Sequence, residues 1–142
     1  MQGIKRDTDY AVRVVFHLAA LGSGANVQVK DIAERRLMPA PFVRRVVARL
    51  AAAGILRTVR GSGGGVRLAR PASAISLLDV VSAMEGGIVL NRCVSDPGDC
   101  PFSGNCAIHL AWADATRRVE ERLGALAFSD LLEPPMEKGK ET

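Results

Sequence analysis

The sequence predicts a mainly α-helical protein with a small β-hairpin wing: a winged helix-turn-helix domain followed by a long C-terminal dimerisation helix. Three observations lead to this prediction. Two short segments of helical periodicity meet at a proline-containing turn, two alternating segments flank a glycine run, and an apolar seam repeats every three or four residues near the C-terminus. The length of 142 residues suits one domain with a helical appendage.

The N-terminal part of the chain is expected to form three helices. The first spans residues 8–21, because Thr8 can cap its start, apolar residues recur at helical spacing and Gly22 stops it. A short second helix ends at the breaker segment 38–41. Pro41 suits the first turn of a third helix, where its missing N–H is harmless. Two short helices joined by a tight turn are typical of a helix-turn-helix motif.

A wing is predicted directly after the third helix. Residues 55–60 and 66–68 alternate like strands, and the glycine-rich run 61–65 joins them as a hairpin. The run lacks the Lys-Ser/Thr pair of a phosphate-binding loop and precedes a strand, which disfavours nucleotide binding. Glycines at a hairpin tip allow positive φ and a close approach to DNA phosphates, with Arg60 and Arg67 on either side. A purely structural tight turn is the alternative.

The C-terminal half is expected to contain a fourth helix from Ser76, a cysteine-bearing loop and a long helix at residues 106–126. Apolar residues recur along the long helix: Ile108, Trp112, Ala115, Val119, Leu123 and Leu126. A thin single domain offers few faces to cover this seam, so the expected partner is the same helix of a second copy, which predicts a homodimer. The polar tail at residues 133–142 is predicted to be disordered.

These elements divide the chain into four predicted parts. Residues 1–86 form the winged helix-turn-helix DNA-binding domain, and residues 87–105 form the cysteine-bearing loop. Residues 106–132 form the dimerisation helix with a short terminal helix, and residues 133–142 form the tail.

Charge is divided unevenly along the chain. Residues 1–70 hold 13 Lys and Arg against 4 Asp and Glu, a balance of +9, whereas residues 71–142 hold 6 against 11, a balance of −5. Such polarity is typical of nucleic-acid binding, and Arg44 and Arg45 stand away from the apolar face of the third helix. A merely solvated surface is the alternative. Double-stranded DNA is therefore the expected partner.

All three cysteines, Cys93, Cys100 and Cys106, lie within fourteen residues, and His109 follows three positions later. Crowded thiolates repel one another unless a metal or a disulfide absorbs the charge. The odd number of cysteines and the lack of a secretory leader argue against disulfides and for a reducing compartment, the cytoplasm. Charged residues also interrupt every apolar run before the ~20 residues of a membrane helix, so no membrane association is expected.

Four motifs together point to a known family. They are Thr-Asp-Tyr-Ala-Val-Arg at residues 8–13, Arg-Gly-Ser-Gly-Gly-Gly at 60–65, Ile-Ser-Leu-Leu-Asp-Val-Val at 75–81 and the three-cysteine loop. Over residues 1–132 the chain resembles the winged-helix regulators of the Rrf-two family, typified by IscR, NsrR and RirA. The resemblance implies a dimeric, DNA-binding bacterial transcription factor whose iron-sulfur cluster senses redox state, nitric oxide or iron and iron-sulfur status.

The resemblance also implies roles for individual residues. The cluster ligands would be Cys93, Cys100 and Cys106. The recognition helix would start at Pro41, Phe42, Arg44 and Arg45, and the wing would enter the minor groove with Arg60 and Gly61 beside Arg67.

Two residues compete for the place of fourth ligand. In the IscR-type pattern it is a histidine three positions after the last cysteine, where His109 stands, and the cluster is 2Fe-2S, the favoured expectation. In the NsrR-type pattern it is an aspartate of the partner subunit, matched here by Asp9, and 4Fe-4S is the alternative. Asp9 could instead complement the positive end of the first helix, and His109 could simply pack at a helix start. The chain departs from the IscR-type pattern by six residues between its first two cysteines and by Arg44, where that pattern has a glutamate.

The expected function is a transcriptional regulator, a repressor or a dual regulator, which binds a palindromic operator under control of the cluster. No enzyme is expected, because neither histidine has a triad partner and the acidic residues show no paired spacing. No small-molecule substrate is expected either. Two rival classes remain at this point: a small iron-sulfur electron carrier or assembly factor, and a zinc-binding structural protein, since three thiolates and one imidazole also suit tetrahedral zinc.

Overall fold

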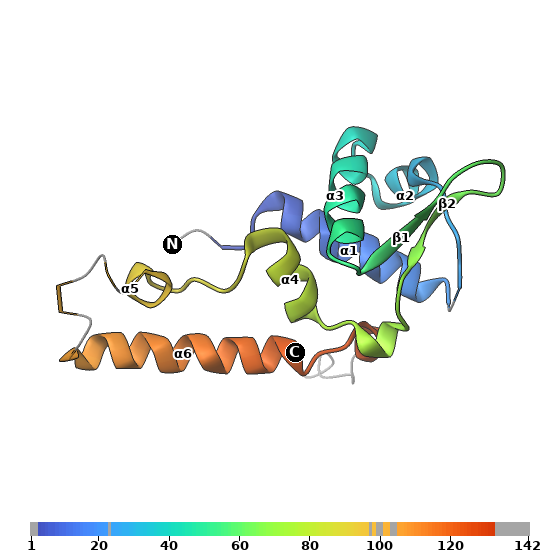
Figure 1. The fold of residues 1–142 in the computed structure, drawn as a ribbon. Coiled ribbons are helices and arrows are strands. Elements are labelled where there is room, and N and C mark those ends of the chain that lie inside the picture. Colours follow the sequence, from blue (N-terminus) through green and yellow to red (C-terminus); the bar gives the residue numbers. More distant parts are fainter. Residues whose placement is uncertain (1–2, 23, 97, 99–100, 103–104, 133–142) are drawn as a thin grey trace, which may run out of the picture.

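The computed structural model describes residues 3–22, 24–96, 98, 101–102 and 105–132. The helices in this part of the chain are α1 (Arg6–Ala20), α2 (Val29–Arg36), α3 (Ala40–Ala52), α4 (Leu77–Glu85), α5 (Arg92–Ser95), α6 (Ala107–Gly124) and α7 (Phe128–Leu131). The strands are β1 (Leu56–Val59) and β2 (Gly65–Leu68), followed by the 3-10 helix η1 (Ala72–Ala74). Figure 1 shows the winged-helix part at one end and α6 running below α4 and beyond it.

The first three helices match the predicted helix-turn-helix with shifted boundaries. Helix α1 begins two residues earlier than expected, with Lys5 as its N-cap, so Thr8 does not cap it and is buried in the first turn instead. Leu37 ends α2 in the left-handed conformation, with φ +54°, although it carries a side chain. Pro39 caps α3, and Pro41 lies in its first turn as predicted.

The wing is a hairpin that a third segment extends. Strands β1 and β2 pair antiparallel, with Val59 opposite Gly65 at the tip end. Val27, which precedes α2, exchanges two backbone hydrogen bonds with Val66, at 2.9 and 2.7 Å. Gly65 is needed at this crossing, because a Cβ there would lie 2.6 Å from the Val27 carbonyl oxygen. The pairing of Val27 with Val66 therefore attaches strand β2 of the wing to the segment that precedes α2.

One hydrophobic core joins the winged helix to the C-terminal segment. Its fully buried side chains come from several elements: Val14, Leu18, Val46, Leu50, Val66, Val80 and Phe128. The backbone N–H of Leu77 donates to Leu126, and that of Phe128 donates to Ile75, both at 2.9 Å. The C-terminal end of α6 is thus held on the winged domain, whereas its N-terminal end extends away from it (Figure 1).

The prediction for the C-terminal half needs two corrections. The expected cysteine-bearing loop contains the short helix α5, and α6 ends two residues earlier than predicted. The start of α4 is as expected, since Ser76 caps it and forms a capping box with Asp79. None of the helices in the described ranges is long and apolar enough to cross a membrane. The tail at residues 133–142 lies outside the described residues.

Only part of the apolar seam of α6 is exposed. This corrects the expectation that the whole seam packs against a second copy of the helix. Val119 and Leu123 are partly buried and face α4 of the same chain. Ile108 and Trp112, at the other end of the seam, are 68% and 39% exposed. Periodicity identified the apolar face of the helix but could not reveal that the chain folds back over half of it.

Candidate functional site

The exposed side of α3 faces a groove that it shares with the wing. The apolar residues of α3 are buried in the core, which turns Arg44 and Arg45 toward solvent. Arg44 lines a groove of ≈ 370 Å³ together with Ala48 of α3, Thr58 of β1 and Gly65 of β2. Helix α3 and the wing therefore present one continuous surface.

Arg45 is already engaged within the protein. Its Nη2 donates to both carboxylate oxygens of Asp7 in the first turn of α1, at 3.0 and 3.1 Å. Its guanidinium carbon also lies 4.6 Å from the centre of the Phe42 ring. Phe42 in turn makes an edge-to-face contact with Tyr10, with ring centres 6.0 Å apart. No local sequence pattern links Asp7 to Arg45, because the two residues are 38 positions apart.

Two other arginines of the basic half hold the fold together. Arg49 donates from Nη2 to the carbonyl oxygen of Met84 at 2.7 Å, which joins α3 to α4. Arg36 donates from Nε to Nδ1 of the buried His17 at 3.0 Å, which joins α2 to α1. Burial lowers the pKa of His17 below its ordinary value of 6.5, and the charges of Arg36 and Arg35 lower it further. The count of basic residues therefore overstates the number of arginine side chains that are free to contact a ligand.

Glycines and one asparagine shape the tip of the wing. Gly61 and Gly63 adopt φ of +91° and +79°, which favour glycine. A Cβ on Gly64 would collide with the Val59 carbonyl oxygen. Nδ2 of Asn26 donates to the Gly63 carbonyl at 2.6 Å, a contact that sequence analysis missed. The hydrogen bond from Asn26 thus holds the tip in place. Arg60 is exposed beside the tip, and Arg67 is half-buried on β2.

The structure brings two of the three cysteines and His109 into one pocket. Cys93 of α5, Cys106 and His109 line a cavity of ≈ 320 Å³, with Asp96 and Phe102 beside them. Cys106 is the N-cap of α6, where the positive end of the helix favours an anionic ligand. Cys100 lies outside the described residues.

The donor set in this pocket fits an iron-sulfur cluster or a metal ion. Nδ1 of His109 is buried, and among the described residues it has no hydrogen-bond partner, as expected of a nitrogen that awaits a ligand. Within the same part of the chain, no three Cys, His, Asp or Glu side chains are grouped closely enough to bind a metal ion on their own. A ligand set of three cysteines would need Cys100 as well.

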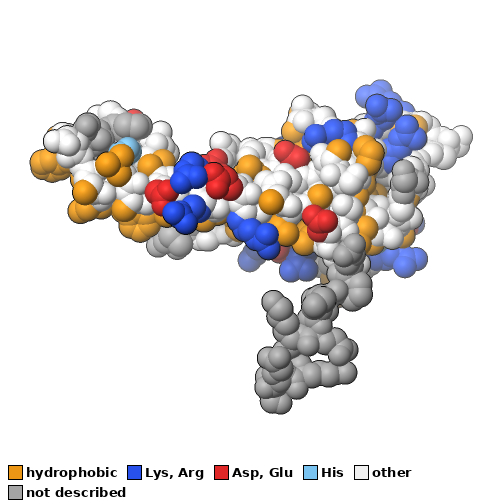
Figure 2. Space-filling model, turned by 90° about the horizontal axis from the view of Figure 1, so that it is seen from below, with side chains coloured by type: hydrophobic (Ala, Val, Ile, Leu, Met, Phe, Trp, Pro, Cys, Tyr) orange, Lys and Arg blue, Asp and Glu red, His pale blue; other side chains and the backbone are white. Residues whose placement is uncertain are grey.

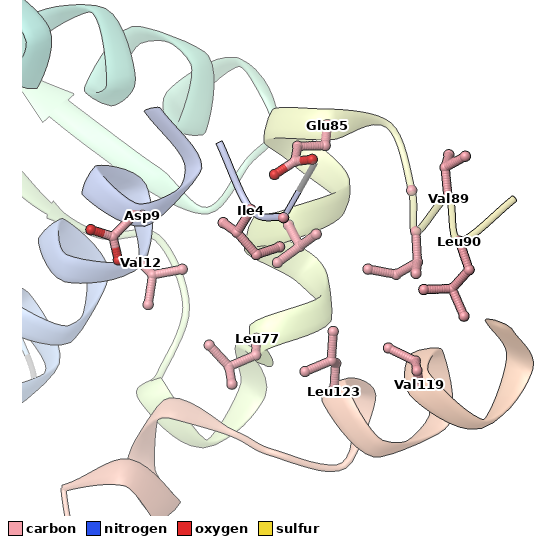
Figure 3. Close-up of a pocket in the computed structure, with 13 residues that line it drawn as sticks. Ile4, Asp9, Val12, Leu77, Glu85, Val89, Leu90, Val119 and Leu123 are labelled. Carbon is pink, nitrogen blue, oxygen red and sulfur yellow. The ribbon is translucent and has the colours of Figure 1, made fainter. Parts of the chain in front are cut away.

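Asp9 lies at a different cavity, which Figure 3 shows in close-up. This cavity of ≈ 450 Å³ lies between the start of α1, α4 and the C-terminal half of α6, where Val12, Leu77, Val119 and Leu123 form part of its apolar wall. Oδ2 of Asp9 accepts a hydrogen bond from Nε of Arg13 at 2.9 Å. Within one subunit, the structure therefore does not bring Asp9 to the cysteine pocket.

The surface differs in character along the molecule. In Figure 2, basic side chains gather at the winged-helix end, and apolar ones dominate the opposite end, around α5 and the start of α6. The apolar end includes Val89, Phe102, Ile108 and Leu110, which are 55–72% exposed. Exposed apolar surface of this kind is typical of a protein interface.

Comparison with known proteins agrees with this geometry. A family model described as Rrf2, iron-dependent transcriptional regulator, matches residues 4–134. The chain is similar to the HTH-type transcriptional regulator IscR of Xenorhabdus nematophila, with 30% identity over 123 residues, 87% of this chain and 74% of that protein.

Two solved structures share the fold. T. potens IscR is 26% identical with a TM-score of 0.74, over 99% of this chain and 96% of that one. CymR, the global cysteine regulator of B. subtilis, is 22% identical with a TM-score of 0.75, over 93% and 97% of the two chains. The similarity thus includes both the winged-helix half and the cysteine-bearing half of the chain.

Proposed function

The chain belongs to the Rrf2 family of helix-turn-helix transcriptional regulators, and from this premise we propose that it is a cytoplasmic repressor whose operator binding is controlled by an iron-sulfur cluster. The predictions of a winged helix and of a regulator that is not an enzyme are confirmed by this family. The observation that carries the proposal is the meeting of Cys93, Cys106 and the unpartnered His109 Nδ1 in one pocket at the start of α6.

The proposed DNA contacts combine the recognition helix and the wing. Pro41, Phe42, Arg44 and Arg45 would lie at the major groove, because the N-terminal part of a recognition helix meets the base edges. Arg60, Gly61 and Arg67 would approach the minor groove from the wing, where arginine is favoured by the negative potential. The exposure of Arg44, Arg45 and Arg60 and the fixed wing tip support this assignment.

Cys93, Cys100 and Cys106 would hold the cluster, with His109 as the fourth ligand of a 2Fe-2S group. The unpartnered Nδ1 supports His109, and the ion pair of Asp9 with Arg13 in its own subunit speaks against Asp9. Asp9 of the partner subunit would serve in the 4Fe-4S alternative. A bound cluster can gain or lose an electron and can be lost altogether, which supplies the signal. Cys106 and His109 connect that signal to the first turn of α6.

The rest of α6 offers a route from the cysteine pocket to the DNA-binding surface. Its C-terminal half forms one wall of the Figure 3 cavity, and the start of α1 forms another. Helix α4 packs against both α6 and α1, so a shift of α6 would reach the start of α1 through α4, and the start of α1 carries Asp7, which pairs with Arg45. The exposed apolar end of α6 supports a homodimer on a palindromic operator, in which two recognition helices are set by the same helix pair.

The test of the cluster proposal is anaerobic purification, followed by visible absorption and by iron and sulfide analysis. Wild-type protein should be coloured, with iron and sulfide in equal amounts, and Cys106→Ser should lose both. Ser95→Ala is the matched control, since the Ser95 hydroxyl donates to the Arg92 carbonyl on the same short helix and its loss should leave the colour intact. A colourless wild-type protein that contains zinc would establish the zinc alternative instead.

A further inference from the structure

We propose that Asp7 is a specificity-determining residue of the DNA-binding surface: by pairing with Arg45, it reserves that arginine for base edges and discourages its use on phosphates. The inference rests on the proposed DNA-binding function and adds a residue outside the helix-turn-helix motif. It concerns the one acidic side chain of α1 that reaches the exposed side of α3 in the described structure.

Arg45 is both accessible and fixed in place. Its side chain is 53% exposed and that of Asp7 is 33% exposed, so the pair lies at the surface beside the recognition helix. The Nη2 atom donates to both oxygens of Asp7, and the guanidinium carbon lies 4.6 Å from the centre of the Phe42 ring, which contacts Tyr10 of α1. An arginine side chain that is already held by two contacts loses less conformational entropy on binding than an unconstrained one does.

The carboxylate of Asp7 changes which DNA groups Arg45 can bind well. The pair has no net charge, and a phosphate that approached Arg45 would also meet the negative charge of Asp7. The major-groove edge of guanine offers the N7 and O6 acceptors without a formal charge, so Asp7 opposes it far less. Asp7 therefore lowers the affinity for DNA in general more than the affinity for a sequence in which Arg45 reads a base.

The neighbouring arginine provides the contrast. Arg44 projects from the same exposed side of α3 into the groove beside the wing, and within the described ranges no carboxylate pairs with it. Its charge remains available to phosphates. We therefore expect Arg44 to contribute to the salt dependence of DNA binding, and Arg45 to contribute little to it while Asp7 is present.

The test compares Asp7→Asn with Glu34→Gln by fluorescence anisotropy on a random-sequence duplex over a range of salt concentrations. Glu34 is an exposed carboxylate of α2, so its variant matches the loss of one negative charge on the same domain. Asp7→Asn should raise the affinity by about two- to five-fold, as expected when an exposed ion pair no longer opposes binding. The salt slope should steepen by about one unit, because Arg45 becomes a phosphate contact. Glu34→Gln should change the affinity less and leave the slope unchanged.

Two further measurements separate the role of Asp7 from that of charge alone. In an Arg45→Ala background, Asp7→Asn should have no more effect than Glu34→Gln, because the partner through which Asp7 acts is gone. On a duplex enriched from a random library by the wild-type protein, Asp7→Asn should raise the affinity less than on random DNA, so that the ratio of the two affinities falls.

The proposal is overturned if Asp7→Asn leaves the affinity for random DNA unchanged or lowers it. It is equally overturned if the enriched-to-random ratio stays constant or rises, or if the full effect persists in the Arg45→Ala background. Failure of the proposed function has a different signature, since the wild-type protein and Arg44→Ala would then bind the random duplex equally poorly.

Discussion

Individual basic residues of the N-terminal half have two separate tasks. Arg36 and Arg49 donate to His17 and to the Met84 carbonyl and hold the helices of the domain together. Arg44 and Arg60 are exposed, and in our proposal they contact DNA. The positive charge of this half could be predicted from the sequence. Which arginines make internal hydrogen bonds could not, because each of these contacts joins residues at least 19 positions apart.

The contact between Arg36 and His17 predicts a pH-dependent stability. Neutral His17 accepts the Arg36 hydrogen bond, and its pKa in the folded protein is lowered below 6.5 by burial and by Arg36 and Arg35. The unfolded chain therefore takes up the proton first as the pH falls. The stabilisation by neutral His17 is complete above about pH 6.5 and should be lost as the pH falls below it toward the folded-state pKa.

Urea denaturation at several pH values between about 7.5 and about 5.5 measures this loss. His17→Asn keeps an acceptor near the position of Nδ1 but does not titrate, so its free energy of unfolding should fall less over this range than that of the wild type. Parallel curves for the two proteins would show that His17 does not contribute.

Helix α6 is the element on which the account of assembly depends. Its C-terminal half faces α4 in the same chain, and Ile108 and Trp112 at its other end remain exposed on the seam. A charge at Val119 would disturb both the subunit and any dimer, whereas a charge at Trp112 affects chiefly the uncovered part. Trp112 is also the only tryptophan of the chain, so its fluorescence reports on burial.

Trp112→Glu should therefore convert the dimer to a monomer in sedimentation experiments, at a cost of about 2–4 kcal/mol of association free energy. Leu110→Glu is the matched comparison, because Leu110 is 68% exposed at the same apolar end but points to roughly the opposite side of the helix. A dimer that survives Leu110→Glu but not Trp112→Glu would place the interface on the seam. If Trp112→Glu sediments as an intact dimer, the seam is not the interface.

On the scale of the whole molecule, the sequence predicted the elements well and their mutual contacts poorly. Pro41 and Ser76 mark helix starts by local chemistry, and the glycine run 61–65 marks the wing in the same way. Such signals depend on a few adjacent residues, so one sequence is enough to interpret them.

The candidate site shows the same limit. The spacing of Cys93, Cys106 and His109 predicted that they would meet, and they line one pocket. The pairing of Asp7 with Arg45 and the cavity between α1 and α6 could not be predicted, because both depend on how distant segments pack. Individual motifs therefore do not indicate how the cysteine-bearing half packs against the winged-helix half.

The central claim is that the state of the cysteine pocket sets the affinity for DNA, and the most direct measurement compares one protein with and without its cluster. The anaerobically purified protein and the same sample after removal of the cluster are titrated onto a duplex enriched from a random library, at fixed salt. The account predicts affinities that differ by about 5- to 150-fold, and Cys106→Ser should behave as the cluster-free form in both preparations. Equal affinities for the two forms of the wild-type protein would contradict it.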